Sequence, residues 1–505
     1  MHLSRRIWIW VKTTYFRITI SKITTCFFLF SFLHCFIHSI VQSVLFSFDT
    51  NANTRASDIV KEAQIPNEVA WLVRHNDNFT LSLCKDVPVQ KSNEASCKLI
   101  FQSGMGPISV PTGFRRRDDE TAASVTDVGI RTVTRINPEV NSSAAAGINF
   151  SSASVNGGST VFLSEQCTRV LVYANQVLNN SKREELALIG SEFWLLGISI
   201  FAIMYDSIPH LLAGFFMRIL STGWSAYSIW RTLDIHNRFQ GLITNGACKV
   251  DLFPGYSHDR FSVQIVDLVL NVVALLLSCY LVWKLVRTYA TCMFRRVGAP
   301  LHLIKIYRFF LGVFICLQMS VYLLVASTSL WIDQLVNGPL VKISAHNNIY
   351  LGSFSVVIIA LLPWIASGWF AVRREMRRTM LVFLCTGALY VAGWGLMYYS
   401  QVFRWTWTQW PFFASLYVAA HFVQLASVVL GVYCRRNFHR GFAQYLYADS
   451  NLERIDFEPE VFPHDANGDI EKQTFEIDFK VALDADDASD KSHEGRVTKS
   501  GRPGA

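Results

Sequence analysis

The chain has 505 residues, of which 51% are hydrophobic and only 17% are charged, and its formal net charge is +8. An ordinary soluble chain is about one quarter charged. This composition therefore excludes a disordered protein, a collagen, a small disulfide scaffold and most cytosolic enzymes. It predicts a polytopic membrane protein that also has sizeable polar parts.

Eight apolar stretches are long enough to cross a bilayer, whose core needs about 20 residues of helix. The second and third are almost contiguous, and Pro209 falls in the first turn of the third, where proline is well tolerated. We therefore expect a tight helical hairpin there. The eight predicted spans are 24–47, 188–206, 209–230, 262–286, 304–332, 349–372, 379–399 and 411–434.

A long polar segment, 48–187, separates the first span from the rest. Four short runs rich in β-branched and aromatic residues recur within it, separated by polar or Gly/Ser-rich stretches, as is typical of a β-rich domain. Residues 167–187 are expected to be helical and to lead into the second span. The runs that predict strands are 79–83, 98–101, 130–134 and 160–163.

Together these patterns predict an all-α polytopic membrane bundle with a small β-rich lumenal or extracellular domain. One N-terminal signal-anchor span, 24–47, precedes a seven-helix bundle over 188–434. The first span is longer than a signal-peptide core and lacks a small-residue cleavage site, which favours a retained anchor. If it were cleaved, a seven-span protein with its N-terminus outside would remain.

Lys and Arg residues close to the span ends predict the orientation. They gather at 1–23, 287–308, 373–378 and 435–440, which places both termini in the cytoplasm and residues 48–187 outside. The outer segment also holds all four Asn-x-Ser/Thr sequons, the acceptors of N-glycosylation. These sites indicate a plasma-membrane or secretory-pathway location, and the acceptors are Asn78, Asn141, Asn149 and Asn179.

Four cysteines fall on the predicted outer side, where two disulfides can form in an oxidising compartment. They are Cys84, Cys97, Cys167 and Cys248, and three pairings are open to them. We favour Cys84–Cys97 and Cys167–Cys248, because the second bond would tie the β-rich domain to the helical bundle.

The C-terminal end changes character after the last span. Residues 435–447 mix basic and aromatic positions, which fits either a short interfacial helix or a plain basic flank. Cys434 is a candidate for S-palmitoylation beside it. Residues 446–505 carry 15 acidic and 7 basic residues, a net charge of −8. Such a segment buries too little apolar surface to fold, so 448–505 is predicted to be a disordered cytoplasmic tail that docks a cytoplasmic partner.

Ionisable groups within a span are functional candidates. Arg218 lies in the middle of the third span, and Asp267 and Asn271 lie one helical turn apart in the fourth. Their depths along the helices are similar, so we expect an Arg218–Asp267 pair with Asn271 alongside. This polar bundle core would serve a ligand pocket, an ion path or a switch, or it would simply fix the helix register.

We expect the other ionisable residues in and near the spans to be weaker functional candidates. Glu192 lies near a predicted span end, so we expect it to be solvated. His34 and His38 are four residues apart in the first span but have no carboxylate or thiolate company beyond Cys35. No phosphate loop, H-E-x-x-H, G-x-S-x-G or C-x-x-C pattern occurs. We therefore expect no enzyme activity, no metal or cofactor, and no nucleic-acid partner.

Several stretches resemble an uncharacterised family of fungal, basidiomycete multi-span membrane proteins. The similarity covers about 185–445 and implies kinship and topology only. It is carried by the stretches Gly190–His210, Gly298–Arg308, Leu362–Arg374 and Arg404–Phe413.

The layout is also similar to two broader classes. Seven-transmembrane receptors share the helix number and the outer cysteine, but the third bundle helix ends in Lys284–Tyr289 without an Asp/Glu-Arg-Tyr motif, and the last span lacks Asn-Pro-x-x-Tyr. Seven-transmembrane proteins with a lumenal GOLD-type domain, such as the Wntless carriers, share the extra N-terminal span. These likenesses imply a receptor-like protein whose ectodomain binds a ligand. The alternatives are a secretory-pathway cargo receptor or chaperone that grips a client protein, and a transporter.

Overall fold

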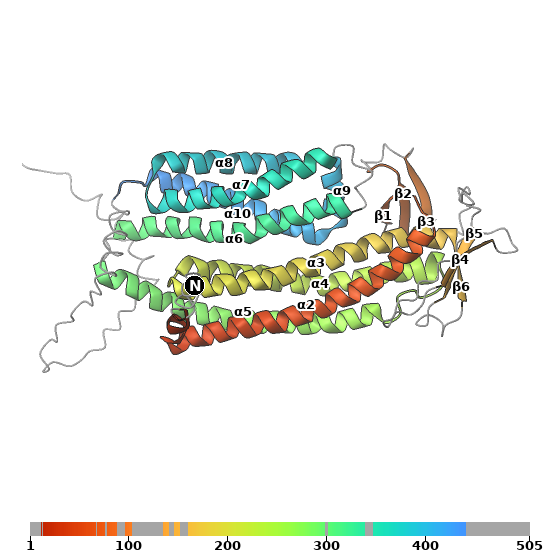
Figure 1. Ribbon diagram of the computed structural model, residues 1–505, viewed down its shortest axis with the longest axis horizontal. Helices are drawn as coiled ribbons and strands as arrows, with labels where there is room; N and C mark the ends of the chain where they lie inside the picture. The colour runs from red at the N-terminus through yellow and green to blue at the C-terminus, as the bar shows by residue number, and fades with distance from the viewer. Residues whose placement is uncertain are drawn as a thin grey trace, which may run out of the picture. The chain divides into compact units, whose positions relative to one another are not determined.

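The structure is a computed structural model (Figure 1). The predicted tail at 448–505, the sequon at Asn141 and residues 441–447 lie outside the part of the chain that it describes. The described residues are 12, 14–66, 68–75, 78–87, 96–103, 135–140, 146–151, 160–297, 301–338 and 347–440.

Long helices dominate the described residues. The first begins at a capping box, in which Ser21 and Thr24 exchange side-chain and backbone hydrogen bonds. A short π-helical segment, η3, follows the third. The elements are α2 (Lys22–Glu62), α3 (Glu165–Met204), α4 (Ile208–Phe239), η3 (Gln240–Ala247), α5 (Tyr256–Val297), α6 (Leu301–Asn337), α7 (Asn347–Arg373), α8 (Arg377–Met397), α9 (Gln401–Gln409) and α10 (Pro411–Arg436).

Seven helices in the described part of the chain are long and apolar enough to cross a membrane: α2, α3, α5, α6, α7, α8 and α10. The sequence predicts an eighth span at 209–230. The structure has a helix there, α4, which packs against α3, α5 and α6. Helix α4 is not among these seven, and buried polar residues such as Arg218 and Ser225 interrupt its apolar sequence.

Helices α2, α3, α5 and α6 have 37 to 42 residues each, well beyond the length that a bilayer requires. The 41 residues of α2 make a helix of about 60 Å, whereas the bilayer core is about 30 Å thick. The predicted boundary at residue 47 is therefore not a helix end. The expected helix at 167–187 is confirmed, because α3 runs without a break from Glu165 to Met204.

The hairpin between α3 and α4 is confirmed. Only three residues, Tyr205–Ser207, join the two helices, and Pro209 lies in the first turn of α4. Asp206 adopts a positive φ of 44°, which reverses the chain. We call this end of the helices the hairpin end.

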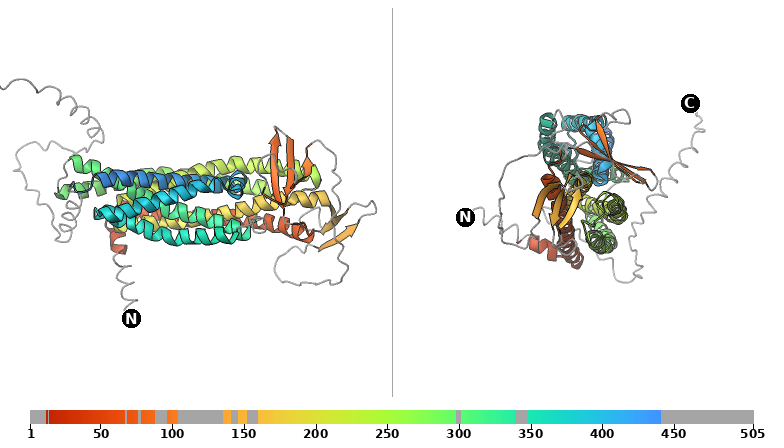
Figure 2. Two further views of the ribbon diagram at one scale, coloured as in Figure 1. Left: turned by 90° about the horizontal axis from the view of Figure 1, so that it is seen from above. Right: turned by 90° about the vertical axis from the view of Figure 1, so that its right-hand side faces the viewer.

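Within the described part of the chain, six strands lie at the opposite end, which we call the strand end (Figures 1 and 2). They form two antiparallel sheets, each with its strands in chain order. Three of the four predicted strand runs match β2, β3 and β6, and the run at 130–134 lies outside the described residues. The strands are β1 (Val69–His75), β2 (Asn78–Cys84), β3 (Cys97–Gln102), β4 (Arg135–Val140), β5 (Ala146–Ser151) and β6 (Thr160–Ser164).

Separate hydrophobic cores stabilise the two regions. The larger one joins α6, α7, α8 and α10 to one side of α3 and α4. The core at the strand end combines the sheet β1–β2–β3 with the ends of α2, α3 and α4. Its buried members include Ala56 and Ile59, Leu171 and Leu178, and Leu242. We call the sheet β1–β2–β3 together with these ends of α2, α3 and α4 the strand-end domain.

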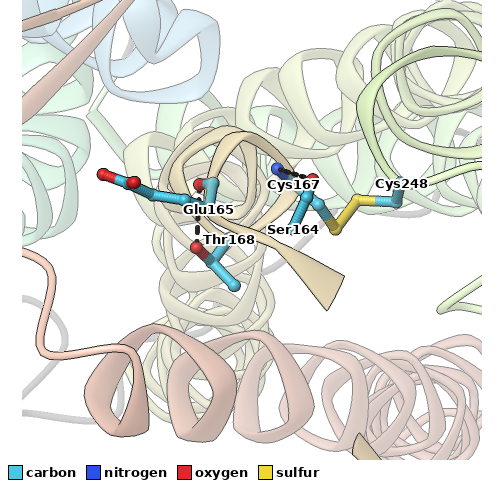
Figure 3. The surroundings of a disulfide bond; sticks show 5 residues. All are labelled: Ser164, Glu165, Cys167, Thr168 and Cys248. Atoms are coloured by element: carbon cyan, nitrogen blue, oxygen red, sulfur yellow. Dashed lines mark hydrogen bonds between the residues drawn. A yellow bond between two sulfur atoms is a disulfide. The ribbon is translucent and has the colours of Figure 1, made fainter. Parts of the chain in front are cut away.

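Both favoured disulfides are present. Cys84–Cys97 joins β2 to β3, and Cys167–Cys248 joins the first turn of α3 to the residue after η3. Figure 3 shows the second bond beside the α3 start, where Ser164 accepts a hydrogen bond from the backbone N–H of Cys167. This disulfide locks two of the helix ends together within the strand-end domain.

Candidate functional site

Eight buried polar side chains meet between α2, α3, α4 and α5, and we call them the polar core. None is more than 8% exposed. Members on the same helix share a face because they recur at spacings of four or seven residues. The polar core consists of His34, His38 and Gln42 on α2, Glu192 on α3, Arg218 and Ser225 on α4, and Asp267 and Asn271 on α5.

At one end of the polar core, His34 lies between a cation and a carboxylate. Its Nδ1 atom is 3.1 Å from Oε2 of Glu192 and 3.1 Å from Nη1 of Arg218. Arginine offers only donors and an ionised carboxylate only acceptors. Nδ1 therefore bonds Glu192 when it carries a proton and Arg218 when it does not.

At the other end, Asp267 gathers donors from three helices. Its Oδ1 atom lies 2.7 Å from Nε2 of His38 and 2.8 Å from Nε2 of Gln42. Its Oδ2 atom lies 2.5 Å from the hydroxyl of Ser225 and 3.3 Å from Nδ2 of Asn271. A carboxylate has about four lone-pair sites, so these contacts satisfy an ionised Asp267 in full.

His38 repeats the arrangement seen at His34. Its Nε2 atom faces the Asp267 carboxylate and also lies 2.9 Å from the amide nitrogen of Asn271. An amide N–H only donates. The position of one proton again decides which neighbour the imidazole bonds.

Glu192 lies between the two imidazoles. Its Oε2 atom faces His34, and its Oε1 atom lies 3.4 Å from Nδ1 of His38 without a hydrogen bond. The two rings stack with their centroids 5.2 Å apart. The groups Arg218, His34, Glu192, His38 and Asp267 therefore follow one another through the polar core. Successive contacts are 2.7 to 3.1 Å, except the 3.4 Å step from Glu192 to His38, which lacks a hydrogen bond.

Buried ion pairs continue the polar core toward the strand end. Glu184 on α3 pairs with Arg231 on α4 at 2.5 Å. Arg260 on α5 lies between Asp49 on α2 and Glu185 on α3 and bonds both. Each arginine compensates acidic groups that would otherwise be costly to bury.

Two small cavities adjoin the polar core, one toward each end of the helices. Each has a volume of about 10 Å³, which is room for about one water molecule. Arg218, His210, Ser199 and Ser278 contribute to the cavity toward the hairpin end. Gln42, Asp267, Asn271, Gln264, Glu184 and Glu185 contribute to the cavity toward the strand end.

The structure brings together the three residues that the sequence singles out. Asn271 lies beside Asp267, as expected. Arg218 contacts His34 instead of forming the expected direct pair with Asp267. The reason is that α2 packs against α3 and α5, so its two histidines meet the charged groups of the other helices.

Sequence reasoning missed three of the five ionisable groups in this chain, namely His34, Glu192 and His38. The expectation that Glu192 is solvated is wrong, since it is only 1% exposed. His34 and His38 find carboxylates on α3 and α5, although α2 itself offers none nearby. A signal was present, because His34, His38 and Gln42 make a polar stripe at four-residue spacing in an apolar helix.

The predicted modification sites have varied surroundings. Asn78 is exposed at the start of β2, Asn149 lies within β5, and Asn179 is half-buried on α3. Cys434 is buried near the end of α10, a position that does not favour S-palmitoylation. Glycosylation and acylation stay predictions.

The long apolar helices and their buried charged network define an integral membrane protein of the polytopic helical class. No protein-family model, curated protein or solved structure matches the chain.

Proposed function

We propose that this protein is a receptor-like membrane protein whose strand-end domain lies outside the membrane and binds a ligand. The helices α2, α3, α4 and α5 would carry the signal inward. One observation carries this proposal: three of the helices that form the polar core, α2, α3 and α4, also build the core of the strand-end domain.

Helix continuity makes mechanical coupling efficient. On α2, 25 residues of unbroken helix separate His34 from Ile59, which corresponds to about 37 Å at the rise of an α-helix. Ile59 packs in the strand-end core, and His34 bonds in the polar core. A ligand that shifts the strand-end domain would thus displace the partners of His34.

The polar core supplies the two-state element that signalling needs. Both His34 and His38 have two mutually exclusive hydrogen-bonding arrangements, as described above. Discrete alternatives of this kind let small displacements switch a buried network.

The strand-end domain also reaches the other half of the bundle. Val69 of β1 and the nearby Val87 pack with Trp405 of α9, and Trp405 is only 3% exposed. The sheet β1–β2–β3 thus contacts α9 as well as the ends of α2 and α3. A ligand on this sheet would act on both groups of helices.

We place the strand-end domain outside the membrane because the basic residues near the span ends predict this orientation and the sequons agree with it. The proposal is tested by expressing a C-terminally tagged chain in a eukaryotic host. Surface biotinylation and glycosidase digestion are then read on the same blot. We expect surface-labelled protein that carries glycan and loses it on digestion, and the variant Asn78→Gln serves as a glycan control.

Two other outcomes decide against a surface receptor. Glycosylated protein that stays inside the cell and escapes the label would favour a cargo receptor of the secretory pathway. If glycosidase shifts neither the wild type nor Asn78→Gln, the protein carries no glycan. That result would overturn the placement of the strand-end domain outside the membrane.

A further inference from the structure

The polar residues of α2–α5 do not stop at the polar core. Toward the hairpin end, His210 borders one cavity and lies 2.6 Å from the hydroxyl of Ser207 in the α3–α4 turn. Toward the strand end, the ion pair of Arg231 lies beyond the other cavity. Along α4, His210 and Arg231 are 21 residues apart, about 30 Å of helix. This distance matches the thickness of a bilayer core.

Buried polar atoms along this route have no hydrogen-bond partner within the described part of the chain. They include Nε2 of His34, Nδ1 of His38, Oε1 of Glu192 and Oε1 of Gln264. An unsatisfied buried polar atom is costly, and water commonly satisfies such atoms. Gln264 and Asp267 line the water-sized cavity toward the strand end. Arg218, the neighbour of His34, lines the one toward the hairpin end.

The charge balance within the polar core calls for one added proton. With both imidazoles neutral, the carboxylates of Glu192 and Asp267 and the guanidinium of Arg218 leave one negative charge. Arg231 and Arg260 are engaged by Glu184, Glu185 and Asp49. One proton on His34 or His38 makes the polar core neutral, and a neutral group is strongly favoured inside a bilayer.

The dimensions of the site select the proton over larger species. A cavity of about 10 Å³ excludes an organic substrate and has room for about one water molecule. Within the described residues, no group of three or more His, Cys, Asp or Glu side chains is arranged to hold a metal ion.

We propose that His34, Glu192, His38 and Asp267 form a proton-conducting path across the membrane. The path begins beside Arg218, which lines one cavity, and ends at Asp267, which lines the other. A proton taken up at Nε2 of His34 makes an imidazolium, which releases its Nδ1 proton to Oε2 of Glu192. Glu192, now a carboxylic acid protonated at Oε2, rotates its carboxyl group so that this O–H faces His38, and it gives that same proton to Nδ1 of His38. His38 then passes its Nε2 proton to Oδ1 of Asp267, at the edge of the second cavity. Each N–H or O–H bond that breaks is matched by one that forms, and a single proton has moved.

This activity does not depend on the receptor-like function, because it needs neither a ligand nor a particular orientation. The test uses the full chain in liposomes loaded with the pH-sensitive dye pyranine. A pH gradient is imposed while potassium and valinomycin clamp the voltage. We expect the wild type to dissipate the gradient faster than protein-free liposomes.

Two conservative variants and one control identify the path. Glu192→Gln and His38→Gln should each slow the flux by about 100-fold, at the scale of a lost proton-transfer group. His421→Gln, on α10 and outside the path, should conduct like the wild type. Size-exclusion profiles and circular dichroism establish that each variant is folded.

Two results would overturn the proposal. One is a wild type that is no faster than protein-free liposomes, a result that does not depend on how any variant folds. The other is folded Glu192→Gln and His38→Gln protein that conducts at the wild-type rate.

Discussion

His38 of α2 and Asp267 of α5 face each other at 2.7 Å, from Nε2 to Oδ1, in a part of the bundle where both are almost fully buried. The contact joins α2, which precedes the strands in the sequence, to α5, which follows α4 and η3. Because three further side chains bond the same carboxylate, Asp267 is the best-satisfied acid of the polar core.

Asp267→Asn should therefore destabilise the fold. An amide places a donor where the carboxylate receives four donors, and breaking a buried charge pair typically costs about 3–5 kcal/mol. Thermal unfolding in detergent measures the loss. Asp259→Asn is the matched control, since Asp259 is exposed on the same helix and a surface change should stay within about 0.5 kcal/mol. Equal losses in both variants would contradict the role of Asp267.

Two arginine–aspartate pairs differ chiefly in burial, and they should differ in stability. Arg260 is 4% exposed and bonds both Asp49 and Glu185, so Arg260→Ala leaves two buried carboxylates uncompensated. We expect it to cost about 3–5 kcal/mol. Arg74 is exposed and pairs with Asp234 at 3.1 Å, and Arg74→Ala should cost at most about 1 kcal/mol. Urea or thermal unfolding of the two variants compares them directly. A larger loss of stability for Arg74→Ala would be inconsistent with the buried ion pairs of Arg260.

The structure predicts which sequons are used. Asn78 is exposed and is the first residue of β2. Asn179 lies within α3, and its sequon partner Ser181 is 1% exposed and receives a hydrogen bond from Arg231. Asn78→Gln should remove one glycosidase-sensitive band shift, whereas Asn179→Gln should leave the pattern unchanged. A glycan found at Asn179 by mass spectrometry would contradict the packing of α3 against α4.

Gly387 lies in a close contact between α8 and α10 that leaves no room for a side chain. A Cβ atom there would lie 2.8 Å from a methyl group of Val428 on α10. Gly387→Val should cost about 1–3 kcal/mol, as overpacking usually does. Gly393 is on the same helix with nothing within 4 Å of an added Cβ, so Gly393→Val should be close to neutral. Thermal unfolding decides, and equal midpoints would rule out the tight α8–α10 contact.

The same glycines show what a sequence pattern can and cannot reveal. The small residues of α8 predict a face for close packing. Only the structure separates Gly387, which touches its neighbours, from Gly393 and Gly395, which do not. Which side of a helix meets a partner depends on the surrounding helices, and the helix sequence does not contain that information.

Much of the fold follows from local sequence physics. Apolar length predicts the positions of the spans, Pro209 predicts the α3–α4 hairpin, and cysteine placement predicts both disulfides. Mean hydropathy does not identify the end of α2, because most of the residues from 49 to 62 are polar. The helix continues because Ala52, Ala56 and Ile59 recur on one face and pack in the strand-end domain. Helical periodicity, rather than mean hydropathy, is the signal that identifies this extension.

The polar core is harder to predict, for a physical reason. Arg218 and Asp267 stand out because each interrupts an apolar stretch. Their actual partners come from α2, which is separated from both by the entire strand-end domain. No local pattern indicates that α2 packs against α3 and α5, so the assignment of Glu192 to His34 and His38 requires the tertiary structure.

We expect α2–α5 to unite the polar core and the strand-end domain in one mechanical unit. Hydrogen–deuterium exchange of the wild type and Glu192→Gln, both in lipid nanodiscs, tests it most directly. Faster exchange in Glu192→Gln is predicted at 48–62 of α2 and at 165–180 of α3, far from the substituted residue, with α8 and α10 unchanged. Exchange that changes only next to residue 192, with both strand-end segments as protected as in the wild type, would contradict the claim.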